Sequence, residues 1–235
     1  LLFPLQLRYA PGEKFFQTRS ERIPVNLDAP VLMLTHIYSP RNLFNSPFEV
    51  NKTEFKAQKR FWLSAFGFID LIVGAGHVWS RSAYLNLLMP NANLSYTIQP
   101  ESFALMNPME FINDSYVSWD FTYWANGAIL NYIPLIKKLK LREAFSFRGW
   151  LGELSDRNNP LKHPELYRFP TDIPNTTDEH NPYKSMHGLP YMEASVGIDN
   201  LFKCLRVDYV WRLTYRKGQP ASARSGPRIA LHVTF

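Results

Sequence analysis

Cysteine is nearly absent from this chain. Cys204 is the only one among 235 residues, so no disulfide can form within the chain. Small secreted domains that depend on several disulfides are therefore excluded. A free cysteine usually packs as a small hydrophobic residue, and we interpret Cys204 in that way rather than as a nucleophile.

Long hydrophobic runs are also missing. A membrane-spanning helix needs about 18 consecutive apolar residues, and no stretch approaches that length. The most apolar window, residues 66–79, is interrupted by Asp70, His77 and three glycines. With a mean hydropathy of −0.24, the chain is not a helical membrane protein. Helical periodicity is weak throughout as well.

Concentrated basic charge is missing, although the net charge is +6. The densest basic clusters, at residues 137–140 and 216–217, are short, and the other basic residues are dispersed. Nucleic-acid binding proteins concentrate such charge on one face, so we expect no nucleic-acid partner. A diffuse basic excess suits an anionic membrane surface.

Patterns that would indicate catalysis or metal binding are not found. His163, His180 and His187 share one polar region, but their spacing matches no zinc site. No motif links a serine or aspartate nucleophile to a histidine. We therefore expect no catalytic residues, no metal and no cofactor.

What the chain has in abundance is period-two alternation, together with an aromatic content of 15%. Val117, Trp119, Phe121 and Tyr123 alternate with mostly polar residues. The same alternation recurs at residues 53–65, 206–216 and 225–235. Successive side chains of a strand point to opposite faces, so these strands have one apolar and one mostly polar face.

Several of the expected strands run to about ten residues, against about 5–6 in soluble sheets and about 9–11 in membrane barrels. Their connections alternate between long polar loops, at 153–188 and 217–226, and a short turn at 199–203. The expected strands are 2–10, 15–25, 29–38, 53–65, 67–79, 93–105, 112–125, 140–152, 189–199, 205–216 and 225–235. These features predict an all-β fold: an antiparallel up-and-down transmembrane β-barrel, or the C-terminal part of a larger one, with about 10–11 strands in this chain.

A soluble β-sandwich is the alternative fold, because its strands also have one apolar face. Three features favour the barrel over the sandwich. The strands are long, Trp and Tyr stand near the ends of the apolar faces, and the polar faces mix Arg with Asp, as a barrel lumen would.

Four stretches resemble the C-terminal barrel of a large Bacteroidota outer-membrane family. They read SFALMN and EFINDSY at 102–107 and 110–116, NG and IPLIKKLKLRE at 126–127 and 133–143, PYMEASVGIDN at 190–200, and RVDYVWRLTY at 206–215. The resemblance is densest from Leu94 to Phe235. Full-length members carry an N-terminal carboxypeptidase-regulatory-like domain and a region of unknown function. The resemblance implies location and architecture but no reaction.

Because the chain begins Leu-Leu-Phe-Pro, without Met or a signal sequence, we interpret residues 1–235 as one barrel region of a longer protein.

Three groups of residues are candidates for function. The first is a charged cluster on polar strand faces, which would form either a ligand site in the lumen or a structural ion-pair network. It comprises Asp120, Arg206, Asp208, Arg212 and Arg228. We expect Asp208 to pair with one of the arginines. The second group comprises lipid-facing aromatic residues, Trp119, Tyr123, Tyr209 and Trp211. The third is a C-terminal assembly signal, Ile229, Leu231, Val233 and Phe235.

The expected function is non-enzymatic: transport across the bacterial outer membrane or assembly of the envelope, within a larger complex. Expected partners are outer-membrane lipid and lipopolysaccharide, the barrel-assembly machinery during biogenesis, and other proteins of that complex. A membrane-embedded hydrolase acting on lipid or peptide, and a soluble binding module, remain as alternatives. The apolar, lysine-containing stretch 126–140 would lie on the inner leaflet or dock a periplasmic partner.

Overall fold

The protein is a meander of antiparallel strands whose order in space follows the order in the chain. The computed structural model describes residues 2–42, 49–95, 97–169 and 183–231. Nine strands form one sheet in the order β1-β4-β5-β6-β7-β8-β9-β10-β11. Their bounds are β1 Phe3–Tyr9, β4 Val31–Ser39, β5 Val50–Trp62, β6 Phe68–Val78, β7 Ser115–Trp124, β8 Arg142–Glu153, β9 Tyr191–Leu201, β10 Leu205–Arg212 and β11 Ser225–Leu231. The expected all-β, antiparallel, up-and-down order is thus confirmed.

Two of the expected strands differ from the structure. The stretch 15–25 is a small separate hairpin of β2 (Phe15–Gln17) and β3 (Arg22–Pro24). The stretch 93–105 is not a strand of the sheet, and makes only isolated bridges, at Ala92 with Phe103 and at Thr97 with Ile229. Burial in this stretch does not follow its alternation, since Leu94 is exposed whereas Ser102 and Phe103 are both buried.

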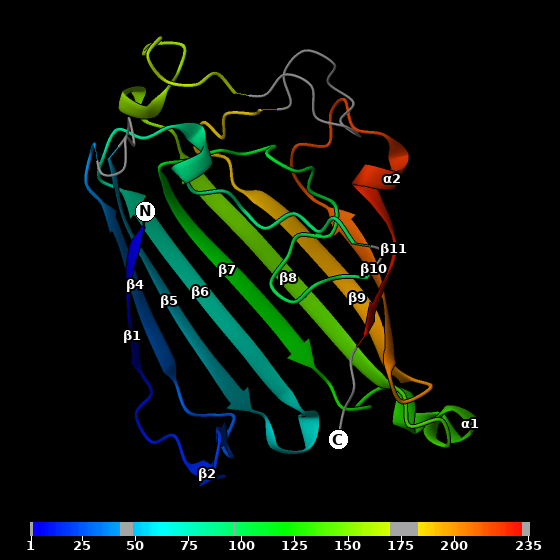
Figure 1. The fold of residues 1–235 in the computed structure, drawn as a ribbon. Coiled ribbons are helices and arrows are strands. Elements are labelled where there is room, and N and C mark those ends of the chain that lie inside the picture. Colours follow the sequence, from blue (N-terminus) through cyan, green and yellow to red (C-terminus); the bar gives the residue numbers. More distant parts are fainter. Residues whose placement is uncertain (1, 43–48, 96, 170–182, 232–235) are drawn as a thin grey trace.

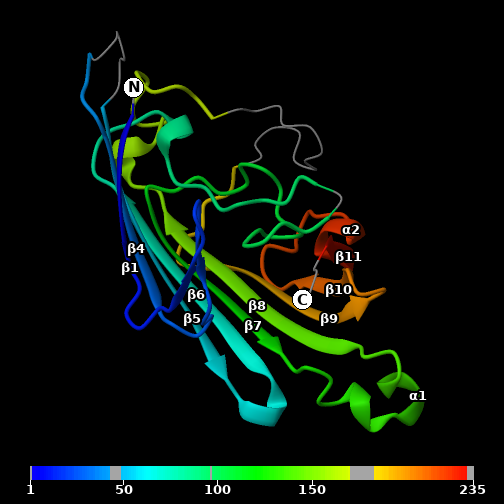
Figure 2. The same ribbon diagram turned by 60° about the horizontal axis from the view of Figure 1, so that its bottom comes forward.

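The sheet curls around the connection 79–114, which we call the inner segment (Figures 1 and 2). This segment lies on the concave side, and Ile98 N donates to Ile229 O of β11 at 2.8 Å. Within the described residues, β1 and β11 are the two edges of the sheet. Closure of the sheet into a barrel stays a prediction.

The connections differ in length between the two ends of the strands. One end carries the long connections 79–114 and 154–190, with 40–49 and 213–224. The other end carries the tight turns 63–67 and 202–204, with the longer connections 10–30 and 125–141. The turn at 63–67 requires glycine, because Gly67 has φ +92° and a Cβ there would lie 1.9 Å from the Trp124 carbonyl oxygen. Longer loops at one end, as expected towards the C-terminus, are confirmed.

In the described part of the chain, helical structure is confined to short pieces: α1 (Pro134–Lys137), α2 (Ala221–Arg224) and the 3-10 turns Ser64–Phe66, Tyr84–Asn86, Leu130–Tyr132 and Asp156–Asn158. Among the described residues, no helix is long and apolar enough to cross a membrane.

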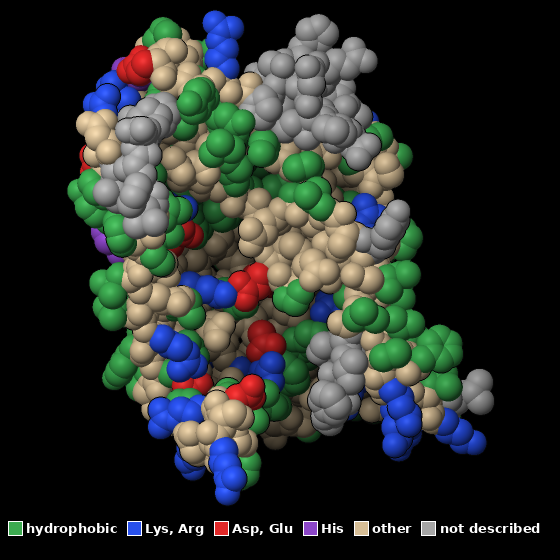
Figure 3. All heavy atoms as spheres, viewed as in Figure 1, with side chains coloured by type: hydrophobic (Ala, Val, Ile, Leu, Met, Phe, Trp, Pro, Cys, Tyr) green, Lys and Arg blue, Asp and Glu red, His purple; other side chains and the backbone are tan. Residues whose placement is uncertain are grey.

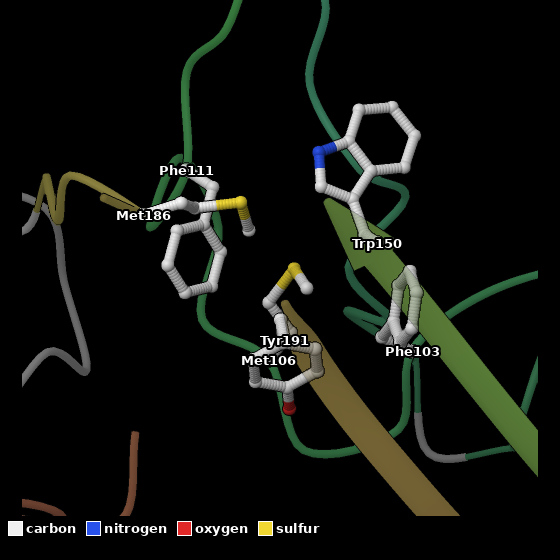
Figure 4. Packing of buried hydrophobic residues seen from close by; sticks show 6 residues of the cluster. All are labelled: Phe103, Met106, Phe111, Trp150, Met186 and Tyr191. Atoms are coloured by element: carbon white, nitrogen blue, oxygen red, sulfur yellow. The ribbon is translucent and has the colours of Figure 1, made fainter. Parts of the chain in front are cut away.

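The buried hydrophobic core lies at the long-loop end, between the inner segment and the concave face. Phe103, Met106 and Phe111 of the inner segment pack with Trp150 of β8 and Tyr191 of β9 (Figure 4). Met186, from the connection 154–190, completes the cluster. A second cluster comprises Val78, Leu87, Leu88 and Ile112. The inner segment is therefore an integral part of the fold, held by burial of apolar surface.

Candidate functional site

Asp208 stands at the centre of the charged cluster on the concave face. Arg206, two residues earlier on β10, donates from Nη2 to Asp208 Oδ1 at 2.6 Å, and both residues are buried. The guanidinium of Arg206 also lies over the Trp124 ring, 4.7 Å from its centroid. The expected pairing of Asp208 with an arginine is confirmed, and Arg206 is the partner.

Gly197 makes room for this ion pair. It lies directly across from Asp208 in the β9–β10 register. A Cβ at position 197 would lie 2.2 Å from Asp208 Oδ1. A larger residue would therefore push the carboxylate away from Arg206.

Arg212 does not pair with Asp208, although the sequence made it one of the candidate partners. Its side chain is 0% exposed and forms an ion pair with Glu110 of the inner segment, whose side chain is 1% exposed. Its Nη1 also donates to the Leu105 carbonyl at 3.2 Å. Burying two charges is tolerated only when they are paired and hydrogen-bonded, and here both conditions hold. Arg212 thus fastens the inner segment to β10.

Glu193 of β9 was not predicted as a site residue. Its carboxylate accepts the backbone N–H groups of Ala104 and Leu105 at 2.9 and 2.8 Å, and the hydroxyl of Tyr191 at 2.6 Å. The period-two pattern does place Glu193 on the polar face of the expected strand 189–199. Its partners could not be found from the sequence, because they are backbone groups of a distant segment.

The remaining candidates also bind the inner segment or a neighbouring strand. Arg148 Nε lies 2.8 Å from Asp120 Oδ2, and Arg148 Nη1 donates to the Ser102 carbonyl at 2.7 Å. Arg228 Nε donates to the Ala104 carbonyl at 3.3 Å. Strands β8 to β11 therefore all contribute side chains that hold residues 102–105. We call this set, Arg148, Glu193, Arg212 and Arg228, the seat of the inner segment.

Two open cavities flank the ion pair between Asp120 and Arg148. Their volumes are about 340 and 290 Å³, and both are lined by Glu101, Asp120 and Arg148. The smaller one also reaches Arg206 and Asp208. Figure 3 shows the concave face hollowed, with acidic and basic side chains together in the hollow. Since the carboxylates here are matched by arginine, lysine or backbone donors, the geometry favours the structural interpretation of the charged cluster over a ligand site.

Within the parts of the chain that the structure describes, no group of three or more His, Cys, Asp or Glu side chains could hold a metal ion. His180 lies outside the described residues.

The convex face carries the apolar halves of the strands. The register places Trp119 opposite Gly149, and a Cβ on that glycine would lie 2.1 Å from the Trp119 ring. Tyr123 shares this face, as do Tyr209 and Trp211, and the latter two are exposed. The four expected aromatic residues are thus together on the face away from the inner segment.

Two of the four residues of the expected C-terminal assembly signal lie within the described part of the chain. Ile229 and Leu231 lie on the convex side of β11, paired with Val207 and Leu205, and both are exposed. Val233 and Phe235 lie outside the described residues.

A polar row crosses the convex face near the long-loop end. His36 Nδ1 lies 2.9 Å from Thr53 Oγ1, and His77 Nδ1 lies 2.7 Å from Ser115 Oγ. Trp79 adds a hydrogen bond from Nε1 to Thr53 Oγ1 at 3.0 Å. The row ends the apolar part of the face with hydrogen-bonded side chains, as at the boundary between an apolar and an aqueous medium.

Comparison with known proteins identifies a family but no activity. A search of curated proteins found no match. The model of a family of unknown function, the DUF5686 C-terminal domain, matches residues 1–153. The first two of the four stretches quoted above lie within this match, and the other two lie beyond it. The chain belongs to the DUF5686 family, of which residues 1–153 represent the C-terminal domain.

Proposed function

We propose that this chain forms the wall of a transmembrane β-barrel in the bacterial outer membrane, with its convex face in lipid and its concave face in the lumen. The observation that carries the proposal is the distribution of polarity between the two faces. In β10, Arg206, Asp208 and Arg212 are buried, whereas Val207, Tyr209 and Trp211 are exposed. Water would favour the reverse arrangement, and a lipid environment favours this one.

Exposed apolar residues lie on every strand of the sheet except β6. The exposed convex residues include Leu5, Leu7, Leu34, Phe55, Val117, Phe121, Phe147, Val196, Ile198, Val207 and Ile229. A soluble surface rarely exposes an apolar patch beyond a few hundred Å². In a β-sandwich the apolar face would be the covered one, but here the inner segment covers the polar face. This contrast supports the membrane over the soluble alternative.

Within the barrel, the inner segment narrows the lumen, and the seat fixes it there. A lumen filled in this way suits a non-enzymatic part in transport or in envelope assembly within a larger complex. The partners that this function entails are outer-membrane lipid, lipopolysaccharide and other proteins of the complex. Assembly would depend on the terminal pattern of Ile229, Leu231, Val233 and Phe235, which the barrel-assembly machinery would recognise by strand pairing.

The test is membrane integration of the full-length protein. We expect it to need detergent for solubility, to stay in the membrane fraction after carbonate extraction, and to migrate differently in gels before and after heating. A protein that stays monomeric in buffer without detergent would overturn the proposal. Conductance in planar bilayers then separates the two roles. A transport protein should conduct ions, whereas a protein that acts in assembly, with the inner segment bound in its lumen, should not.

A second candidate function, hydrolysis of lipid or peptide, has one observation in its favour. The structure brings Ser115 and His77 within 2.7 Å on the face proposed to meet lipid, as a serine nucleophile and its base require. Among the described residues, however, no hydrogen bond joins this imidazole to a carboxylate, and the neighbouring His36 and Thr53 form a similar pair without a nucleophilic serine. Ser115→Ala tests it: loss of a phospholipase or peptidase activity with unchanged folding would establish the hydrolase.

A further inference from the structure

The connection 125–141, between β7 and β8, projects beyond the ends of the strands (Figures 1 and 2). Several of its large apolar side chains are exposed. Tyr132 is 86% exposed, and Ile129, Ile133 and Leu139 are exposed as well. Lys137, Lys138 and Lys140 stand exposed among them. Figure 3 shows hydrophobic and basic side chains next to one another on this projection.

The projection is held in a defined conformation. The buried carboxylate of Glu143 accepts the backbone N–H groups of Gly127 at 2.9 Å and of Ile129 at 3.1 Å, and a third from Leu130. A carboxylate with several amide donors fixes the backbone around it. The backbone that carries the exposed apolar side chains is therefore fixed by hydrogen bonds.

The adjacent turn between β9 and β10 enlarges the same surface. Asn200 Nδ2 donates to the Lys140 carbonyl at 2.7 Å, which joins the two turns. Phe202 in that turn is 87% exposed, and Lys203 beside it is exposed too. We call residues 125–141 together with 200–204 the basic apron.

The charge of the basic apron has one sign. Neither 125–141 nor 200–204 contains an aspartate or a glutamate. An anionic surface therefore meets four exposed lysines without repulsion, and Tyr and Phe rings suit the depth of lipid headgroups. The apron is also continuous with the convex face, since exposed Ile198 lies two residues before Asn200 on β9.

We propose that the basic apron binds the phosphate-bearing headgroup layer of an anionic phospholipid leaflet, with Tyr132 and Phe202 inserted and Lys137, Lys138 and Lys140 on the phosphates. This inference rests on the proposed membrane location of the sheet. The long-loop end would then face away from this leaflet, so the apron also orients the sheet in the bilayer.

The experiment uses an environment-sensitive fluorophore on single cysteines in a Cys204→Ser background. The protein is reconstituted in vesicles of phosphatidylcholine alone, or with added phosphatidylglycerol. A label at Tyr132→Cys reports on the apron, one at Val196→Cys on the convex face, and one at Leu161→Cys on the exposed opposite end. In anionic vesicles we expect blue-shifted emission at positions 132 and 196, and emission as in water at position 161.

The lysines are tested by Lys137→Gln/Lys138→Gln/Lys140→Gln. Each lysine near an anionic surface contributes about fivefold to binding, so the triple variant should shift the docking equilibrium about a hundredfold and return the label at 132 to water. The matched control, Lys162→Gln/Lys217→Gln at the long-loop end, should leave it unchanged.

Three results would overturn the inference. Emission as in water at position 132 together with blue-shifted emission at position 196 is the first. It would mean that the sheet is in lipid but that the basic apron does not bind the leaflet and is free for a protein partner. A blue shift at 132 that is equal in both vesicle types and insensitive to the lysines would remove the role of the phosphates. Emission as in water at 196 would show instead that the sheet itself is not in lipid, which is failure of the proposed function.

Discussion

The edge strand β1 and the later strand β10 share the same alternating pattern but differ in what covers them. Burial alternates strictly in β10, where every second residue from Arg206 to Arg212 is buried on the concave face. All seven residues of β1 are exposed, including the apolar ones. The difference comes from the inner segment, which bonds to β8–β11 and leaves β1 uncovered. Alternation thus reveals which residues share a face, whereas the depth of burial depends on a segment from elsewhere in the chain.

The largest expected effect comes from breaking the buried ion pair that holds the inner segment. Arg212→Ala leaves Glu110 paired with the partly exposed Lys184, at 3.1 Å, and should cost roughly 3–5 kcal/mol of unfolding free energy. The partly buried pair Arg60–Asp70 of β5 and β6 offers the comparison, and Arg60→Ala should cost less, about 1 kcal/mol. Urea unfolding of the refolded protein in detergent measures both.

The control for this comparison replaces both buried charges at once. Arg212→Met with Glu110→Leu removes the pair without leaving a lone charge, so it should recover most of the loss. If Arg212→Ala and Arg60→Ala lower the free energy of unfolding equally, the inner segment does not make the later strands more stable than the earlier ones.

The next effect should be the same in both regions, since it depends on lipid rather than on the inner segment. Val196→Arg in β9 and Leu7→Arg in β1 each place a charge on the convex face, at a cost of roughly 2–4 kcal/mol near mid-depth. Val196→Leu is the control and should be neutral. Folding yield into vesicles measures the effect, and full tolerance of both arginines would contradict a lipid-facing surface.

A smaller effect is expected from crowding the Asp208 ion pair. Gly197→Ala brings a methyl group into the space of the carboxylate and should cost about 1–3 kcal/mol. Gly226→Ala is the matched control in the same region, because its Cβ would meet only the flexible end of Arg228, at 3.3 Å. Similar melting temperatures for the two variants would mean that Asp208 can move without loss.

The smallest effect lies outside the sheet, at Glu165 in the connection 154–190. A hydrogen bond from its own backbone amide, together with the charges of His163 and Arg81, lowers the pKa of this carboxyl. A lowered folded pKa contributes stability above the unfolded pKa, and that contribution is lost as pH falls through the folded pKa. Glu165→Gln should therefore lower the melting temperature slightly at neutral pH, with the difference from the unmodified protein vanishing in acid.

Much of the sheet could be predicted from the sequence, because period two assigns side chains to faces without knowledge of the fold. Trp119, Tyr209 and Asp208 were placed on their faces in this way, and Arg206 was among the expected partners of Asp208. The inner segment was not foreseen, since residues 93–105 alternate like a strand. Glu193 was missed, and Arg212 was a candidate partner of Asp208 but pairs with Glu110. The partners of both residues lie far away in the chain, and no local pattern encodes such contacts. Glu143 was missed for a related reason, because its partners are backbone amides.

The hydrogen bond from Arg228 to Ala104 joins residues 124 positions apart, and this spacing has a consequence for the order of folding. The inner segment precedes β8 to β11 in the chain, and its seat is complete only when β11, the last described strand, has formed. Contacts of such long range are slow to form, since a large loop must close first. Phe103 and Phe111 of the inner segment therefore stay unburied until the remaining strands have formed. A chaperone that shields aromatic side chains would matter most for this protein at that stage of folding.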